Sequence, residues 1–533
     1  MKFKKVDFYK NYDFDNWAIF CHAISEMYAK YIYKLENDKD FFEKNKQYIP
    51  DDIRARDLNF FNPDSKLMYM PWGLYSAGQA ADSDNPCMIT KRDKNIVKFI
   101  IGDSGGFQIE TGVIKWEGDK TREKMLRWLE NNTEISMILD VPTGSIKKKF
   151  GKYHEEKFEY SPEENKKKID FFFCLERTCE NNDYFIKNRI PGKTKFLNVL
   201  QGRYHDFELD DEEIDSYNFE NLSWQERKEL FKKGKISETD AWYKTVKKYS
   251  DKKLFGERAF EGWALAGVHK IDFSMLLRRI VYLIFDDLLH NKPWIHILGM
   301  GKIPIICLYS VILKMIKNNK KLGIPDLKIS CDASSGFSSA GGYALVYKEI
   351  KMDKKTWALS FDKIPVNEKF KNSKSPVITS TGVILEEIFE SSIYKFFTMG
   401  DIYNIGKSSI GYVYMMHHNT YVLQKAVVEG QKIFEKENLA DYLPIEFLNI
   451  KKAIEDVLSC DTRNQMMKEI KKNLNVLQKL KDSSAKVSEI ENDDLFHIDL
   501  IPIKKKKKKE KNSDSLKNRN NVDDKLINHF FEF

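Results

Sequence analysis

The stretch KFIIGDSGGFQIETG, Lys98–Gly112, begins as an apolar run and continues with an acid, a hydroxyl, two glycines, an aromatic and an amide. Apolar runs of this length are typical of strands that are buried on both faces, as in a parallel sheet. The residues that carry chemistry come where such a strand would end. The stretch therefore predicts a buried parallel strand that places Asp103 at the edge of a sheet.

Five further apolar runs also end in small or acidic residues: ISMILDVPTG, KFLNVLQGR, GWALAGV, WIHILGMGK and LKISCDASSG. Amphipathic helical patterns lie between them, such as TREKMLRWLENN and FSMLLRRIVYLIFDDLLH. The intervals between strand ends, for example from Asp103 to Asp140 and from Gly299 to Asp332, match one βα unit of about 30 or more residues. The chain thus repeats a βα unit.

Six such units, with an earlier candidate strand at KLMYMPWG, predict an α/β fold of the (β/α)8 TIM-barrel type over residues 55–430. An open doubly wound sheet is the alternative, and its ligands also bind at strand ends. In a barrel, the residues at the carboxyl ends of the strands converge on one mouth. These residues are Asp103, Asp140, Gln201, Gly267, Gly299 and Asp332.

The remaining segments are predicted from composition. Residues 1–54 are predicted to be an N-terminal helical segment, and 206–258 a polar insertion in the barrel domain. Residues 431–500 form a lysine-rich helical extension, and 501–533 a basic, disordered tail. The tail contains KKKKKKEK, which supplies most of the net charge of +8. A nucleic-acid surface on the body would therefore be a local patch, to which the tail adds non-specific attraction for phosphates.

The composition also bounds the class of protein. With 42% hydrophobic and 32% charged residues, the 533-residue chain is typical of a soluble globular protein. It has no apolar run of about 18 residues, and its polar start does not fit a signal peptide. Its seven cysteines form no disulfide framework. These features predict a cytoplasmic protein without a membrane segment.

Each candidate residue has a simpler explanation. An Asp after a strand often caps the next helix, and glycines at strand ends often serve tight turns. Capping alone would have to account for acids at three strand ends, a Gln-Gly pair and two glycine-rich ends. Their shared position favours a functional site.

The motifs carry a family resemblance. DSGGFQ at 103–108 resembles the signature of the tRNA-guanine transglycosylase family, (β/α)8-barrel enzymes that exchange guanine for a 7-deazaguanine base. The other segments resemble the family's motifs in the family's order: LDVPTG, VLQG, GWALAGV, HILGMG and SCDASS. HHN at 417–419 resembles the segment that carries the family's last zinc ligand.

The resemblance implies a role for each matching residue. Asp332 would be the nucleophile that attacks the anomeric carbon, and Asp103 the general acid and base. Asp140 and Gln201 would bind the edge of the base with the backbone at Gly267, and Met300 or Leu298 would pack on the purine face. The implied substrate-binding set is Ser104, Gly105, Gly106, Phe107, Gln108, Asp140, Gln201, Gly202, Gly267, Leu298, Gly299 and Met300.

The chain also departs from the family. The family's zinc is bound by a Cys-x-Cys-x-x-Cys cluster and a histidine, but here no cysteine occurs between Cys331 and Cys460. Only His418 of that site is matched, so we expect no metal and no cofactor. The tRNA enzymes have Asp-Glu-Cys-Thr-Pro where this chain has Asp140-Val141-Pro142-Thr143.

These departures favour the DNA-guanine transglycosylase branch of the family, the DpdA type, and a bacteriophage member. The resemblance then implies a pentosyltransferase that inserts a 7-deazaguanine such as preQ0 into DNA and so helps phage DNA evade restriction. The base would have to be flipped out of a duplex or taken from a single strand. Expected partners are DNA, the free base and helper proteins, in the host cytoplasm.

Two alternatives stay open: a tRNA-guanine transglycosylase, and a non-catalytic partner subunit of such an enzyme. Lysines and aromatics in the insertion, as in NLSWQERKELFKKGK, would either grip a nucleic-acid strand or form a solvated helix face. The oligomeric state is also open.

Overall fold

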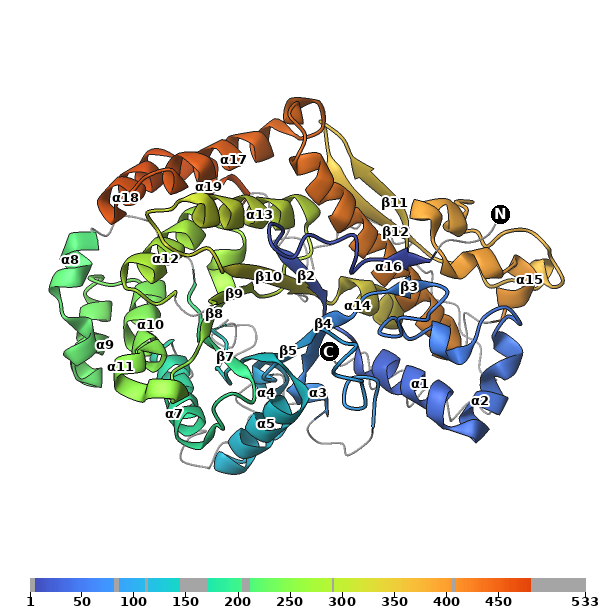
Figure 1. Cartoon of the computed structure of the whole chain (residues 1–533), viewed down its shortest axis with the longest axis horizontal. Helices are drawn as coiled ribbons and strands as arrows, with labels where there is room; N and C mark the ends of the chain where they lie inside the picture. Colours follow the sequence, from blue (N-terminus) through green and yellow to red (C-terminus); the bar gives the residue numbers. More distant parts are fainter. Residues whose placement is uncertain are drawn as a thin grey trace, which may run out of the picture.

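The computed structural model describes residues 5–80, 86–110, 114–143, 171–203, 211–289, 292–404 and 409–480. Eight parallel strands form the central sheet, in the order β2–β10–β9–β8–β7–β6–β5–β4. Their bounds are β2 Ile19–His22, β4 Trp72–Ser76, β5 Phe99–Asp103, β6 Ile135–Met137, β7 Lys195–Leu200, β8 Gly262–Leu265, β9 Trp294–Ile297 and β10 Lys328–Ala333. The strands lie at the centre of the molecule with helices around them (Figure 1).

The two ends of the sheet meet at β2. This strand pairs with β10 along its length, and the N–H of Ala23 donates to the carbonyl of Ala333 at 2.9 Å. On its other side, Ala23 forms a parallel bridge with Leu74 of β4, and the N–H of Ile24 donates to Leu74 O at 2.9 Å. The sheet is therefore nearly closed, which is compatible with a (β/α)8 barrel.

All six apolar runs form strands of this sheet, as predicted, because their side chains are buried on both faces. Helices occupy the intervals between the strands from β4 to β10. They are α3 Ala77–Ala80, α4 Gly106–Glu110, α5 Asp119–Asn132, α7 Phe171–Asn188, α8 Asp211–Ser216, α9 Trp224–Lys232, α10 Glu238–Val246, α11 Lys252–Phe255, α12 Phe273–Phe285 and α13 Ile303–Asn318. The α/β alternation read from the sequence is thus confirmed.

The prediction for residues 1–54 was wrong in one respect. The segment contains the helices α1 Glu26–Asn37 and α2 Lys39–Asn45, but also β2, which belongs to the central sheet. The strand IFCH is only four residues long, so it has no recognisable period in the sequence, although all four side chains are buried. The sheet therefore begins before the predicted boundary at 55.

The candidate strand KLMYMPWG also divides differently from the prediction. Met68–Tyr69 form β3, which pairs with β1 Val6–Asp7 in a separate two-stranded sheet. Pro71 follows, and only then does the barrel strand β4 begin at Trp72. Pro71 has no N–H to donate to a ladder, but its carbonyl accepts from Lys98 N at 2.7 Å and so leads into the β4–β5 pair.

After β10 the chain adds elements outside the sheet. They are α14 Ser335–Tyr343, the antiparallel hairpin of β11 Val346–Met352 and β12 Trp357–Asp362, α15 Met399–Ile402, α16 Ser409–Phe434, α17 Ile445–Leu458, α18 Arg463–Lys472 and α19 Leu474–Leu477. The predicted boundary at 430 falls inside α16. The basic tail at 501–533 lies outside the described residues. Within the described ranges, we find no helix with the length and apolar character needed to cross a membrane.

The C-terminal helices pack against the barrel domain. α17 lies against α13, and α18 against α12 (Figure 1). Asp215 connects the insertion to the C-terminal helices, because its carboxylate binds Lys244 of α10 at 2.5 Å and Arg463 of α18 at 2.7 Å. The Arg463 guanidinium also lies 4.1 Å from the ring centre of Tyr282 on α12. The insertion, α12 and the extension are thus connected through charged groups.

Gly262 at the start of β8 gives a test of strand packing. A Cβ there would lie 2.5 Å from Trp294 O and 2.6 Å from Leu197 Cδ2, and backbone cannot move aside as a side chain can. We expect Gly262→Ala to lower the free energy of unfolding by about 1–3 kcal/mol, measured by urea denaturation. The control is Gly342→Ala in α14, which meets nothing within 4 Å. It should be neutral or stabilise by up to about 1 kcal/mol. Equal stability of Gly262→Ala and wild type would contradict the packing described.

Candidate active site

The predicted site residues lie at the carboxyl ends of the parallel strands. Asp103 ends β5, and Asp332 is next to last in β10. Asp140 and Gln201 follow β6 and β7 along the chain. Because all the strands are parallel, these ends lie on the same side of the sheet, which we call the mouth.

Asp332 is held by groups from β9 and the turn after it. Its Oδ1 accepts the N–H of Gly299 at 2.9 Å and lies 3.2 Å from Nε2 of His296. Its backbone carbonyl accepts the N–H of Met300 at 2.6 Å. The side chain of Asp332 is 13% exposed, so it is fixed at the mouth yet still reachable.

Asp103 lies in the field of a second carboxylate. Burial raises its pKa, and the charge of Asp332 raises it further. Hydrogen bonds from Ser76 and from the N–H of Gly105, at 3.4 Å, act in the opposite direction. Asp103 therefore holds a proton more readily than an ordinary aspartate, which suits a group that donates and then accepts a proton.

Asp140 and Gln201 form a pair at the mouth. Nε2 of Gln201 donates to Oδ2 of Asp140 at 2.7 Å, and both residues are less than 10% exposed. Burial raises the pKa of Asp140 to about 7, with a further contribution from the charge of Asp103. The carboxyl is thus close to half protonated at neutral pH, so it offers both a donor and an acceptor to a bound molecule.

The glycines of the motifs allow backbone segments to touch. Gly267 has a φ of +64°, and a Cβ on it would lie 2.5 Å from the carbonyl of Gly202. Gly106 lies against the carbonyl of Asp140, where a Cβ would come within 2.6 Å. Gly105, with a φ of +86°, lies against Gly78. Each of these positions therefore requires glycine for packing at the mouth, whether or not a ligand is bound.

The other predicted residues differ in accessibility. The hydroxyl of Ser104 is buried and has no hydrogen-bond partner among the described residues. Gln108 contacts the hydroxyl of Ser76 at 3.3 Å. Met300 is a core residue, 4% exposed, whereas Leu298 is half-buried. Of these two side chains, Leu298 is the more exposed. The side chain of Phe107 lies outside the described residues.

Two residues of the mouth were missed from the sequence: Ser76 and His296. His296 is fully buried within WIHI, and a buried imidazole in a strand must find hydrogen-bond partners. In a strand, side chains two apart share a face. That rule, applied to the paired strands β9 and β10, would have placed His296 beside Ser330 and Asp332.

His418 has a role that needs no metal. Its Nδ1 lies 2.7 Å from the hydroxyl of Ser391, and its Nε2 lies 2.9 Å from the carbonyl of Tyr347. The carbonyl only accepts, so Nε2 carries the proton and Nδ1 accepts from the serine. Burial lowers the pKa of His418 to about 4. Both nitrogens are thus occupied. Among the described residues, no three His, Cys, Asp or Glu side chains are grouped to hold a metal ion.

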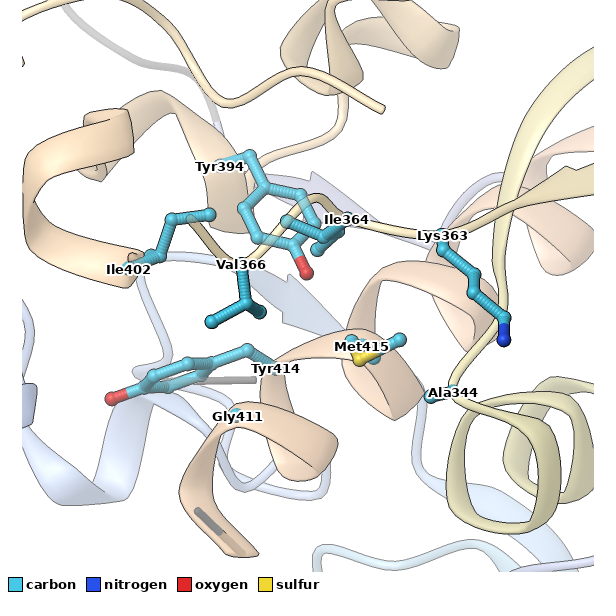
Figure 2. Close-up of a pocket in the computed structure, with 9 residues that line it drawn as sticks. All are labelled: Ala344, Lys363, Ile364, Val366, Tyr394, Ile402, Gly411, Tyr414 and Met415. Atoms are coloured by element: carbon cyan, nitrogen blue, oxygen red, sulfur yellow. The ribbon is translucent and has the colours of Figure 1, made fainter. Parts of the chain in front are cut away.

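A cavity of about 110 Å³ is lined by residues that follow β10 along the chain (Figure 2). It is bounded by the ends of α14 and α15, by the segment after β12 and by α16. Nine residues line it: Ala344, Lys363, Ile364, Val366, Tyr394, Ile402, Gly411, Tyr414 and Met415. This lining is mainly apolar and contains no carboxylate or imidazole. The mouth of the barrel is therefore the better candidate for an active site.

Comparisons with known proteins bear on the motif resemblance. The sequence matches none of the protein-family models and none of the curated proteins. The resemblance to the transglycosylase family therefore remains a hypothesis, and the function proposed below depends on the geometry of the mouth together with the motifs.

Replacing His418 tests its structural role. We expect His418→Ala to lower the free energy of unfolding by about 2–4 kcal/mol, because the Ser391 hydroxyl and the Tyr347 carbonyl would be left buried and unpaired. Thermal unfolding followed by circular dichroism measures this loss. A metal chelator should leave the wild-type transition unchanged. A clear fall in wild-type stability on chelation would show that a metal contributes.

The raised pKa of Asp140 predicts a pH dependence. The folded protein binds this proton more tightly than the unfolded chain does. The contribution of the protonated Asp140 to wild-type stability is therefore lost as the pH rises from the ordinary aspartate pKa of 3.8 to the raised pKa of about 7. Asp140→Asn cannot ionise. Its stability relative to wild type should increase by about 2–4 kcal/mol between pH 4 and pH 8, measured by urea denaturation. A constant difference across this range would contradict a raised pKa.

Proposed function

We propose that the chain is a DNA-guanine transglycosylase, which exchanges guanine in DNA for a 7-deazaguanine through a covalent glycosyl-enzyme intermediate. The proposal includes a (β/α)8 barrel of the family's type, with the reaction at its mouth. The observation that carries it is the pair of carboxylates, Asp103 and Asp332, which belong to distant strands yet lie close enough for the charge of one to raise the pKa of the other. Ordinary helix capping does not require this proximity.

In the first step, Asp332 acts as the nucleophile. One of its carboxylate oxygens bonds to C1′ of the nucleotide while the bond from C1′ to N9 of guanine breaks. Guanine leaves with the electron pair of that bond and takes a proton from Asp103, whose raised pKa supports this role. A carboxylate suits the step because it divides one difficult substitution into two easier ones, each with an oxocarbenium-like transition state.

In the second step, the incoming base reverses the sequence. Asp103, now ionised, takes the N9 proton of the 7-deazaguanine, and N9 bonds to C1′. The ester bond to Asp332 breaks, and both carboxyl groups return to their initial states. The Asp140–Gln201 pair would bind the polar edge of either base, since it presents donors and acceptors side by side. Leu298 would pack on the face of the ring.

DNA is the polymer proposed because the chain lacks the cysteine cluster of the family's tRNA enzymes, and because both nitrogens of His418 bind protein groups. Because Asp103 is only partly exposed and Asp140 is buried, the target base must leave its stack to reach them, as in other enzymes that act on bases. The same argument makes a single-stranded or mispaired base the easier substrate.

The test is base exchange. Purified full-length protein is incubated with radiolabelled guanine or 7-cyano-7-deazaguanine and, in parallel, with duplex DNA, single-stranded DNA and tRNA. We expect label in DNA only. Asp332→Ala should reduce incorporation by at least about 10³-fold, because the nucleophile is lost. Asp103→Asn should reduce it by about 10²–10⁴-fold.

The controls separate the alternatives. Lys452→Ala, on the exposed face of α17, should keep wild-type exchange. Label in tRNA only would overturn the choice of DNA and support the tRNA enzyme. Label in neither polymer, with or without added host extract, would overturn the catalytic proposal and leave the non-catalytic partner subunit. Full activity of Asp332→Ala would remove the nucleophile assignment.

A further inference from the structure

A chain of hydrogen bonds runs inside the barrel from its floor to Asp332. Nε1 of Trp294 donates to the hydroxyl oxygen of Ser330 at 2.6 Å. The same oxygen lies 2.8 Å from Nδ1 of His296, whose Nε2 lies 3.2 Å from Oδ1 of Asp332. We call these four residues the polar column.

The column lies within the barrel rather than outside it. Trp294 and His296 are two apart in β9, and Ser330 and Asp332 are two apart in β10, so each pair shares a face. Trp294 packs edge-on against Phe99 of β5, at 5.5 Å between ring centres. β5 is four strands away from β9 in the sheet, so this contact crosses the barrel interior. His296 and Ser330 are fully buried there.

The number of donors and acceptors in the column determines which nitrogen of the His296 imidazole carries the proton. Ser330 has one hydroxyl proton and already accepts from Trp294, and an ionised Asp332 can only accept. With a neutral His296 that carries its proton on Nε2, the serine donates to Nδ1 and the imidazole donates to Asp332, so every group is satisfied. A doubly protonated imidazole would leave the serine proton without an acceptor within the column.

The column acts on one oxygen of the carboxylate. His296 and the N–H of Gly299 both point to Oδ1, and among the described residues Oδ2 has no hydrogen-bond donor. Oδ2 is thus the free oxygen, which bonds to C1′. When the ester breaks, negative charge returns to the carboxylate, and the two donors at Oδ1 stabilise it as a leaving group.

We propose that His296 is a positioning residue, held by Ser330 and Trp294 in its Nε2-protonated form, which orients Asp332 and assists its departure from the covalent intermediate. The inference rests on the proposed function for its kinetic consequence, but the tautomer does not depend on it. No proton leaves the imidazole during the reaction. The bonds formed and broken are those already given for Asp332.

The kinetic test compares two replacements of His296. Leu removes the donor, whereas Gln places an amide N–H where Nε2 stood. We expect His296→Leu to lower kcat for exchange by about 10–100-fold with KM for the base little changed, and to increase the fraction of protein covalently bound to DNA on a denaturing gel. His296→Gln should recover kcat to within about threefold. The control is His22→Leu, on the outer face of β2, which should keep wild-type kinetics.

The outcomes distinguish this inference from the proposed function. Full activity of His296→Leu would overturn the positioning role while leaving the transglycosylase intact. The same holds if His296→Leu and His296→Gln are both as stable as wild type and lose equal amounts of kcat. If wild type exchanges no base, the proposed function fails instead. In that event 15N NMR of the histidine-labelled resting protein still decides the tautomer. The column is supported if Nε2 of His296 carries the proton in wild type and if this preference is lost in Ser330→Ala. A proton on Nδ1 of His296 in wild type would overturn it.

Discussion

The mouth depends on the closure of the sheet by β2. Without this four-residue strand, β10 and β4 would be exposed edges, and the interior that buries His296 and Ser330 would be open on one side. Closure places β5 and β10 around one interior, so Asp103 and Asp332 lie near each other although more than two hundred residues separate them. A short strand that contributes no acid is thus what allows two acids far apart in the sequence to lie near each other.

Bringing carboxyl groups together in a buried place lowers the stability of the fold and raises their pKa values. Burial raises the pKa of both Asp103 and Asp140, and each acid is also affected by a neighbouring one. At Asp332, two donors hold Oδ1 in place. Similar side chains are therefore placed in different surroundings: Asp103 and Asp140 lie where burial raises the pKa, and Asp332 accepts two hydrogen bonds at one oxygen.

The sequence was sufficient to predict the strands that end in the candidate acids. It was not sufficient to predict the groups that hold those acids in place. The six apolar runs are long and buried on both faces, so their pattern was clear, and the acids at their ends lie at the mouth. β2 was missed because IFCH has too few residues for a pattern. His296 was missed because its role depends on Ser330, a neighbour in the sheet and not in the chain. Pairing register, which a single sequence does not give, supplies that information.

The region around His418 is held together by hydrogen bonds. In a zinc site, the histidine would use one nitrogen for the ion, and the metal would tie several segments together. Here His418 joins α16 to Ser391 and to Tyr347, and Asn419 binds the N–H of Tyr347 and the carbonyl of Leu345, each at 2.9 Å. These bonds are individually weaker than metal coordination, so they must be supported by packing. The close contact of α14 and β11 with the buried face of α16 supplies that support. Within the described residues, hydrogen bonds and packing thus account for the position of His418 in α16.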